Sequence, residues 1–307
     1  VHSIANMGGL FMKKNLLFIL NPTAGKTHIK NALFDVINAF SEADYRVTVY
    51  PTKEPKDGQK VVISEGQDYD LIVCAGGDGT LDDVITGYML SKCQVPLGYI
   101  PAGSTNDFAR SLGIPLEPMA AVTNIITGAP FSIDVGRFNK NDYFIYVAAF
   151  GAFTEVSYST NQQFKNMFGH AAYIMSSLRG LNSITTYKAT IRYDGKEITD
   201  TFIYAMVTNS LSVGGMRNVV LADDVQFDDG IFECLLIKAP TKPLELQAII
   251  NSLLISEVNE KYMYCFKASS LEVISDTEIP WVMDGEFGGN QTHVTIENCQ
   301  KSLRIIR

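Results

Sequence analysis

Hydrophobic and polar positions alternate along this chain in two ways, and the change falls near residue 130. The first part holds four apolar runs of the kind that form parallel strands buried on both faces. They are residues 16–20, 46–50, 69–75 and 95–100. Between these runs apolar residues recur at helical spacing, for example at Ile29, Leu33, Val36, Ile37 and Phe40. Strands that alternate with helices predict a doubly wound α/β sheet.

Beyond residue 130 the runs are short and β-rich, which indicates an antiparallel sheet. They span 132–138, 142–150, 187–199, 202–209, 230–237, 262–268, 270–275 and 293–298. Asp194–Gly195 is a typical two-residue hairpin turn. Helices are expected over 161–181, where apolar residues form one stripe, and over 244–255.

Length and composition support two folded domains. The chain has 307 residues, of which 46% are hydrophobic and 19% charged, as is typical of a globular protein with a large core. We predict an α/β domain over 13–132, joined by a C-terminal return over 289–307, and a β-sandwich domain over 133–288.

Charge and cysteine content exclude some classes of function. The net charge of −8 argues against nucleic acid as a partner, because phosphate binding needs a basic surface. The five cysteines are scattered, which indicates reduced thiols in a cytoplasmic protein. No run approaches the roughly 20 apolar residues of a membrane span, so we expect a soluble protein. Met7 or Met12 is a candidate natural start.

A polar loop follows each of the four predicted parallel strands. These loops are NPTAGK (21–26), PT (51–52), GGDGT (76–80) and PAGSTND (101–107). In doubly wound sheets, ligands bind beyond the carboxyl ends of the strands. The four loops are therefore expected to converge on one crevice.

The first loop ends in GKT but is not a Walker A motif, because Leu20 stands where that motif needs a glycine. Its backbone N–H groups and Lys26 can still hold a phosphate. The alternative is that Pro22 and Gly25 only begin a helix. The candidate nucleotide contacts are Asn21, Pro22, Thr23, Ala24 and Gly25.

The third loop does not fit the dinucleotide fingerprint either, because Asp82 stands in place of its third glycine. The carboxylate of Asp78 would repel bare triphosphate but attracts Mg²⁺, which can bridge to phosphate oxygens. We therefore predict a metal–nucleotide site; the alternative is an acidic surface turn. Its candidate contacts are Gly76, Gly77, Gly79, Thr80, Leu81 and Asp82.

The fourth loop adds hydroxyl and amide groups at the start of a helix. Ser104 and Thr105 supply hydroxyls after the turn at Gly103. Asn106 and Asp107 can orient phosphate, metal or a substrate hydroxyl. The alternative is that these side chains only cap the helix, and both roles can coexist.

Five motifs in this order resemble the diacylglycerol kinase catalytic family, and most of all its soluble bacterial members. They are NPTAGK, GGDGTLDDV, PAGSTNDFARSLGIP, DDGIFE and MDGE. NAD kinases and phosphofructokinases carry loops similar to GGDGT, so the first and third motifs together are the specific ones. The likeness runs from about Lys13 to the C-terminus.

The resemblance implies a fold and an activity. The fold is a nucleotide-binding domain like that of NAD kinases and phosphofructokinases, followed by a β-sandwich that receives a lipid. The activity is transfer of the γ-phosphoryl group of ATP, with Mg²⁺, to the hydroxyl of diacylglycerol, which gives phosphatidic acid. The resemblance also makes Thr52 a nucleotide contact.

The resemblance further implies a structural Mg²⁺ in the acidic loop 223–232. Its ligands would be the carboxylate of Asp229 and the main-chain carbonyls of Gln226 and Ile231. This ion would tie the loop to Asp78, and Asp134 would belong to the same acidic network of the active site. The alternative is an ordinary solvated turn.

Glu286, in MDGE, is the candidate general base. A primary alcohol loses its proton as it attacks the γ-phosphoryl group, and a nearby carboxylate can accept that proton. Asp78 is the alternative base, and Asp284 is expected to face the opposite side of a strand. The predicted catalytic set is Glu286, Asp78, Lys26, Asp107 and Asp134.

Two other functions stay open: a kinase of this fold that acts on another lipid or on NAD, and a non-catalytic nucleotide- or lipid-binding regulator. The expected partners are diacylglycerol or a related lipid and, transiently, the inner face of the membrane. The helix over 161–181 and the strand AAFGAF (148–153) are candidate walls of the lipid cleft; the alternative is that the helix only packs into the core. Lys188, Arg192 and Lys196 form either a modest interfacial patch or a solvated face. The oligomeric state is left open, a homodimer included.

Overall fold

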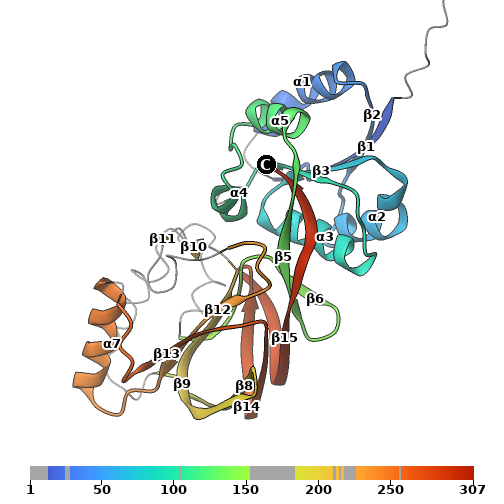
Figure 1. Cartoon of the computed structure of the whole chain (residues 1–307). Coiled ribbons are helices and arrows are strands. Elements are labelled where there is room, and N and C mark those ends of the chain that lie inside the picture. Colours follow the sequence, from blue (N-terminus) through green and yellow to red (C-terminus); the bar gives the residue numbers. More distant parts are fainter. Residues whose placement is uncertain are drawn as a thin grey trace, which may run out of the picture.

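The structure is a computed structural model of the chain. It describes residues 13–24, 28–103, 106–152, 184–209, 212–213, 216–217, 226–255 and 257–307. Figure 1 shows a helix-rich lobe formed by the first half of the chain and a β-rich lobe formed by the second. None of the helices described is both long and apolar enough to cross a lipid bilayer.

The first half forms a parallel sheet in the strand order β4–β3–β1–β2. Its strands are β1 (Lys14–Leu20), β2 (Tyr45–Pro51), β3 (Leu71–Gly76) and β4 (Leu97–Pro101). Its helices are α1 (His28–Glu42), α2 (Asp57–Glu65), α3 (Asp78–Leu90), α4 (Asp107–Leu112) and α5 (Pro118–Thr127), with a short 3₁₀ turn η1 (Gly66–Asp68).

Alternate residues of β1 pack on two helical layers, because successive side chains of a strand point to opposite faces. Leu17 and Ile19 join the core that contains α2 and α3. Leu16 and Phe18 join the core that contains α1 and α5. The predicted doubly wound sheet is therefore confirmed.

Strand β2 differs from the prediction that all four strands are buried. It pairs only with β1 and lies at the edge of the sheet, where four of its seven residues are exposed. Its alternation of polar and apolar residues is the sequence signal of a half-exposed strand.

The second half is an antiparallel sandwich, as predicted. Its strands are β5 (Pro130–Phe138), β6 (Asp142–Phe144), β7 (Val147–Gly151), β8 (Tyr187–Tyr193), β9 (Lys196–Thr208), β10 (Ser212–Val213), β11 (Met216–Arg217), β12 (Phe232–Lys238), β13 (Met263–Ala268), β14 (Ser270–Met283) and β15 (Glu286–Ile306). Helix α7 (Pro243–Ile255) agrees with the helix expected at 244–255. The helix expected over 161–181 lies outside the described residues.

Aromatic side chains fill the interior of the sandwich. Trp281 contacts Phe138 and Phe150, with ring centroids 5.3 and 4.9 Å apart. The predicted hairpin turn at Asp194–Gly195 is confirmed, because both residues have the positive φ that such turns need.

Two long strands, β5 and β15, run between the lobes side by side (Figure 1). Strand β15 begins at Glu286 and ends beside β4, where Ile305 pairs in parallel with Leu97. Leu303 and Ile305 are buried in the core shared with α2 and α3. Because these strands continue across residues 133 and 289, the domain boundaries at those positions stay predictions.

Candidate active site

A cavity of about 600 Å³ lies where the two halves of the chain meet. Its walls come from the loops after β1 and β2, the first turns of α2 and α3, the start of β6, and the hairpin between β14 and β15. They include Asn21, Thr23, Thr52, Lys53, Glu54, Pro55, Lys56, Gln59, Gly79, Thr80, Asp82, Asp83, Thr86, Asn141, Asp142, Tyr143, Met283, Glu286 and Phe287. This volume is within the range of small-molecule sites.

Asn21 joins the first loop to the third. Its amide donates to the hydroxyl of Thr80 over 2.8 Å. Its side-chain oxygen accepts from the backbone N–H and the hydroxyl of Thr23, at 2.9 and 2.8 Å. Pro22 and Ala24 complete this turn, whereas Gly25 and Lys26 lie outside the described residues.

Glycines let the third and fourth loops touch. A Cβ on Gly76 would lie 2.5 Å from the Cβ of Thr80, and one on Gly103 would lie 2.7 Å from the Cα of Gly77. Real Cβ atoms do not approach so closely, so the loop sequence is fixed by packing. The side chain of Leu81 is buried in the core, so only its backbone could meet a ligand.

Asn106 is bonded to its own loop, and its predicted nucleotide contact stays a prediction. Its side-chain oxygen accepts from the N–H of Gly103 at 2.9 Å, and its amide donates to the carbonyl of Gly103 at 3.0 Å. The buried side chain therefore shapes the fourth loop and is not turned toward the cavity. Ser104, Thr105 and the side chain of Asp107 lie outside the described residues.

The loop after β2 forms one wall of the cavity. The backbone of Thr52 donates to the carbonyl of Leu20 over 2.9 Å, which fixes its position at the strand end. The N–H of Lys56, a residue with a φ of 67°, donates to the carboxylate of Asp83 on α3 over 2.8 Å. Lys53 and Lys56 thus bring positive charge to an otherwise acidic cavity.

Glu286 faces the third loop across the cavity. Its Oε1 atom lies 3.8 Å from the position that a Cβ on Gly79 would occupy. Asp78 is the first residue of α3, so the positive end of the helix dipole points to the same place. The structure therefore brings the predicted base and the predicted metal–nucleotide loop together.

Asp284 was expected on a strand, facing the side opposite to Glu286. The structure instead places it in a turn. Asp284 and Gly285 form a two-residue turn, with φ values of 47° and 90°, and Met283 pairs with Glu286. The Asp-Gly dipeptide is the sequence signal for this turn. The carboxylate of Asp284 is turned inward and accepts from the N–H groups of Ile145, Tyr146 and Val147, at 2.5, 3.1 and 2.9 Å. Because these groups bond to Asp284, the apolar run 142–150 is divided into β6 and β7.

Carboxylates crowd one side of the cavity. Burial raises the pKa of Asp82 well above its usual value, and the negative charges of Asp284, Asp83, Glu286 and Asp142 raise it further. Burial also raises the pKa of Asp284 to about 7, against the opposing effect of its three backbone hydrogen bonds. Such crowding is relieved by a cation.

The donor set fits Mg²⁺ that is bound together with a nucleotide. Carboxylate oxygens are the ligands that this ion prefers, and it usually keeps several waters and phosphate oxygens. In the part of the chain that the structure describes, no three acidic, histidine or cysteine side chains converge closely enough to hold an ion by themselves. Water and phosphate oxygens would therefore complete the coordination.

Asp134 lies with the acidic loop 226–230 and is not among the cavity residues. Its carboxylate is fully buried and accepts from the N–H of Gly230 at 2.7 Å and that of Lys301 at 2.8 Å. Its N–H donates to the carbonyl of Phe227 over 2.7 Å. The structure therefore places Asp134 as an anchor that joins this loop to β5 and β15.

The predicted structural metal site stays a prediction. One carboxylate oxygen of Asp229 accepts from the N–H of Ile231 at 3.0 Å, which leaves the other oxygen for an ion. Asp228 is 3.4 Å from the ammonium of Lys301. The half-exposed carboxylate and neighbouring carbonyls of Gln226 and Ile231 are suitable donors.

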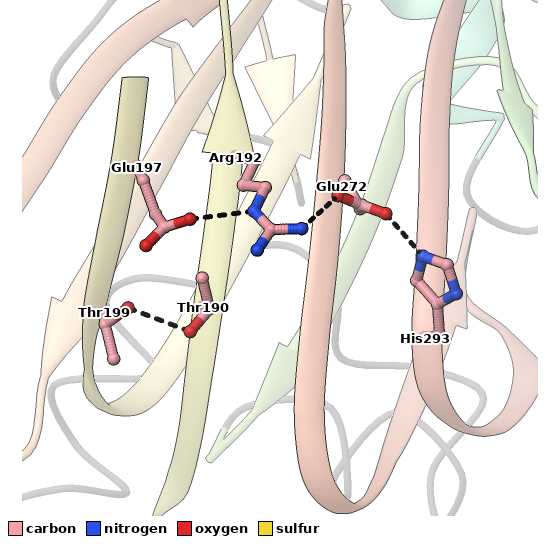
Figure 2. Close-up of polar contacts among 6 residues, drawn as sticks. All are labelled: Thr190, Arg192, Glu197, Thr199, Glu272 and His293. Atoms are coloured by element: carbon pink, nitrogen blue, oxygen red, sulfur yellow. Dashed lines mark hydrogen bonds and ion pairs between the residues drawn. The ribbon is translucent and has the colours of Figure 1, made fainter. Parts of the chain in front are cut away.

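Arg192 on the β8–β9 hairpin is paired with acidic side chains. Arg192 contacts Glu197 and Glu272 at 2.8 and 3.2 Å, and Glu272 contacts His293 at 2.8 Å (Figure 2). The charge of Arg192 is therefore balanced within the sheet surface, as expected of a solvated face.

Several residues of the cavity wall were not predicted from the sequence. Asp142 and Tyr143 come from β6, and no local pattern marks them as part of a nucleotide site. Lys53 and Lys56 follow Thr52 directly, so the charged run after the second strand was a usable signal. Phe287 follows the predicted base and lines the same wall.

Comparison with known proteins identifies the family. The diacylglycerol kinase catalytic domain matches residues 15–138, and the YegS C-terminal NAD kinase beta sandwich-like domain matches residues 147–307. A diacylglycerol kinase of Bacillus subtilis (strain 168) is 33% identical over 278 residues, which is 90% of this chain and 91% of the relative. The chain belongs to the diacylglycerol kinase family. The resemblance carried by its motifs is thereby confirmed.

Further relatives of the diacylglycerol kinase family cover nearly the whole chain. A diacylglycerol kinase of Staphylococcus carnosus (strain TM300) is 32% identical over 96% of this chain and 95% of its own length. A solved structure of a candidate diacylglycerol kinase from Bacillus anthracis str. Sterne has a TM-score of 0.79 at 27% identity and covers 95% of this chain and 96% of its own. The predicted fold class is confirmed across both halves.

Proposed function

We propose that this protein is a lipid kinase that transfers the γ-phosphoryl group of ATP to the free hydroxyl of diacylglycerol, which gives phosphatidic acid and ADP. The observation that carries the proposal is the position of Glu286, whose carboxylate faces the glycine loop and the N-terminus of α3 across one cavity. The relatives named diacylglycerol kinase support the same reaction.

The nucleotide would bind against the first, second and third loops. The N-terminus of α3 and the backbone around Gly79 favour phosphate, and Lys53 and Lys56 add positive charge. Asp82, with Asp78 beside it at the start of α3, would hold Mg²⁺. When bound, Mg²⁺ neutralises the phosphate oxygens and so supplies electrostatic stabilisation.

Glu286 would act as the general base. The lipid hydroxyl oxygen attacks the γ-phosphorus, the bond from that phosphorus to the bridging oxygen breaks, and ADP leaves. The hydroxyl proton passes to the carboxylate of Glu286, which is exposed in the cavity wall. Asp78, at the start of α3, is less suited to this role, because it is not among the residues that line the cavity, whereas Glu286 is.

The substrate implies a transient contact with a membrane surface, and we propose that the protein acts from the cytoplasm at the inner face. The net charge of −8 speaks against broad electrostatic docking on anionic lipid. The contact would therefore be brief and local. A homodimer stays a prediction.

An acceptor panel with γ-labelled ATP tests the proposal. The purified chain is incubated with Mg²⁺ and, separately, diacylglycerol in mixed micelles, monoacylglycerol, sphingosine and NAD. We expect labelled phosphatidic acid as the main product and no label in NAD. Transfer to NAD alone would replace the proposal with an NAD kinase. No transfer to any acceptor, with ATP still bound, would indicate a regulator.

A further inference from the structure

The two-residue turn that carries Glu286 is fixed to the rest of the protein through Asp284. The carboxylate accepts three backbone N–H groups, from Ile145, Tyr146 and Val147. The N–H of Asp284 donates to the carbonyl of Val147 over 2.9 Å, and the hydroxyl of Tyr146 donates to the carbonyl of Asp284 over 2.8 Å. Five hydrogen bonds thus join one turn residue to one three-residue segment.

Outside the turn, Glu286 is held by its pairing with Met283 of β14. It is the first residue of β15 and is exposed, as is the next residue, Phe287, whose side chain has 54% of its surface accessible. The side chain of Asp284, in contrast, points into the protein. The turn and this pairing therefore set the position of the Glu286 backbone.

The segment that receives Asp284 is itself rigid. Ile145 and Val147 are buried, and the carbonyl of Tyr146 accepts from the hydroxyl of Thr208 at 2.6 Å and from the N–H of Asn209 at 3.1 Å. Ile145 packs in the core shared with α2 and α3, Val147 packs in the core that contains α7, and none of the three residues lines the cavity. The 145–147 segment can therefore act as a fixed support for Glu286, which lines the cavity.

We propose that Asp284 is a positioning residue, which holds the β14–β15 turn on the 145–147 segment and so keeps Glu286 within reach of the phosphoryl acceptor. The proposal rests on the proposed function, in which Glu286 is the base. Because a small misplacement of a catalytic group can cost about 10²-fold in rate, the anchor should affect turnover and leave nucleotide binding nearly unchanged.

A double-mutant cycle tests the anchor. D284N keeps the side-chain shape but places an amide among backbone donors. We expect kcat to fall at least about 10-fold in D284N with KM for ATP within about threefold of the parent. In an E286Q background the same substitution should lower the residual kcat by less than about twofold, because the residue it positions is already disabled.

Two further variants complete the cycle. Y146F removes only the hydroxyl that donates to the Asp284 carbonyl, and we expect a loss in kcat of about 2–10-fold at unchanged KM. D276N, an exposed position on β14, should match the parent in both constants. If the melting curve shows that D284N does not fold, the kcat of Y146F alone tests the anchor role.

Three results would overturn the anchor role: an unchanged kcat in D284N, an equal fractional loss with and without E286Q, or an unchanged kcat in Y146F when D284N is unfolded. Each requires a parent that phosphorylates diacylglycerol. A parent without this activity overturns the proposed function instead, so the two failures are distinguishable.

Discussion

Glu286 and Asp82 carry the same chemical group in different surroundings. Glu286 is exposed in the cavity wall, where a substrate hydroxyl can reach it. Asp82 is half buried among Asp284, Asp83, Glu286 and Asp142, and both burial and these charges raise its pKa. The exposed carboxylate is suited to exchange protons with a substrate, and the crowded one is suited to a cation.

Replacement of Glu286 by glutamine should remove proton acceptance and keep the shape of the side chain. We expect kcat to fall by at least about 10² in E286Q, with KM for ATP within about threefold of the parent. Steady-state kinetics with diacylglycerol in mixed micelles measures both constants. Glu278→Gln, an exposed position on β14, is the matched control. A loss below about fivefold in E286Q would assign the base to another group.

Glu233 on β12 gives a prediction about stability and pH. Its side chain has 1% of its surface accessible, and burial raises its pKa from 4.5 to about 7, although Lys267 lies 3.4 Å away. At pH values between 4.5 and about 7, the Glu233 carboxyl is protonated in the folded protein but ionised in the unfolded chain. Stability contributed by this group therefore falls as the pH rises from about 4.5 to 7.

Glu233→Gln removes this dependence. We expect E233Q to be more stable than the parent by about 2–3 kcal/mol at pH 8, with the difference vanishing toward pH 4. Urea unfolding at both pH values measures it, and E278Q should show no such trend. Equal stability of parent and E233Q at pH 8 would show that the ion pair with Lys267 compensates for burial.

Among the elements, the contact between the third and fourth loops depends on glycine. A Cβ on Gly103 would lie 2.7 Å from the Cα of Gly77 and 2.9 Å from the side-chain oxygen of Asn106. Neither neighbour can move without displacing the start of a helix. The loops must therefore separate if Gly103 gains a side chain.

We expect Gly103→Ala to raise KM for ATP at least about fivefold and to lower the melting temperature. The control is Gly195→Ala, in the distant β8–β9 turn, where φ is 74° and nothing lies within 4 Å of the added atom. G195A should cost about 1–2 kcal/mol of stability from backbone strain and leave KM unchanged. An unchanged KM in G103A would remove the fourth loop from the nucleotide site.

The elements with a strong local period could be predicted from the sequence, and those set by long-range pairing could not. The buried strands, α1, α7 and the turn at Asp194–Gly195 each have a local signal. The cavity residues Asp142 and Tyr143 reach the site only because β5 pairs with both β6 and β15. The pairing of β5 with β15 joins segments far apart in the chain, so no local sequence pattern indicates it.

The same distinction between local signals and long-range contacts applies to the site residues. The loops after strands converge because every parallel strand ends at one edge, so Asn21, Thr52 and Gly79 could be expected together. The burial of Asn106 on its own loop and the inward turn of Asp284 depend on positive φ values of 53° and 47°. The turn at Asp284–Gly285 has a local signal in its Asp-Gly dipeptide, but the backbone groups that donate to its carboxylate lie far away in the chain.

At the scale of the whole molecule, β5 and β15 connect the two halves through Asp134. This buried carboxylate accepts from Gly230 of the acidic loop and from Lys301 of β15. Asp134 therefore joins the acidic loop to β15, the strand that begins at Glu286. An ion bound at Asp229 would strengthen this connection.

Asp229→Ala tests the predicted structural ion. Without nucleotide, we expect Mg²⁺ to raise the melting temperature of the parent by about 2–5 °C and not that of D229A. D229A should also melt lower in the absence of the ion, because it loses the bond to the N–H of Ile231. Asp276→Ala should keep the Mg²⁺ response. An equal response in D229A would place the ion elsewhere.

A crystal structure with a non-hydrolysable ATP analogue and Mn²⁺ tests the proposed nucleotide and metal site most directly. The anomalous signal of Mn²⁺ locates the metal. We expect the triphosphate at the N-terminus of α3, the metal within reach of the Asp82 carboxylate, and the terminal phosphate facing Glu286. A nucleotide bound outside this cavity, or a terminal phosphate turned away from Glu286, would contradict the proposed site.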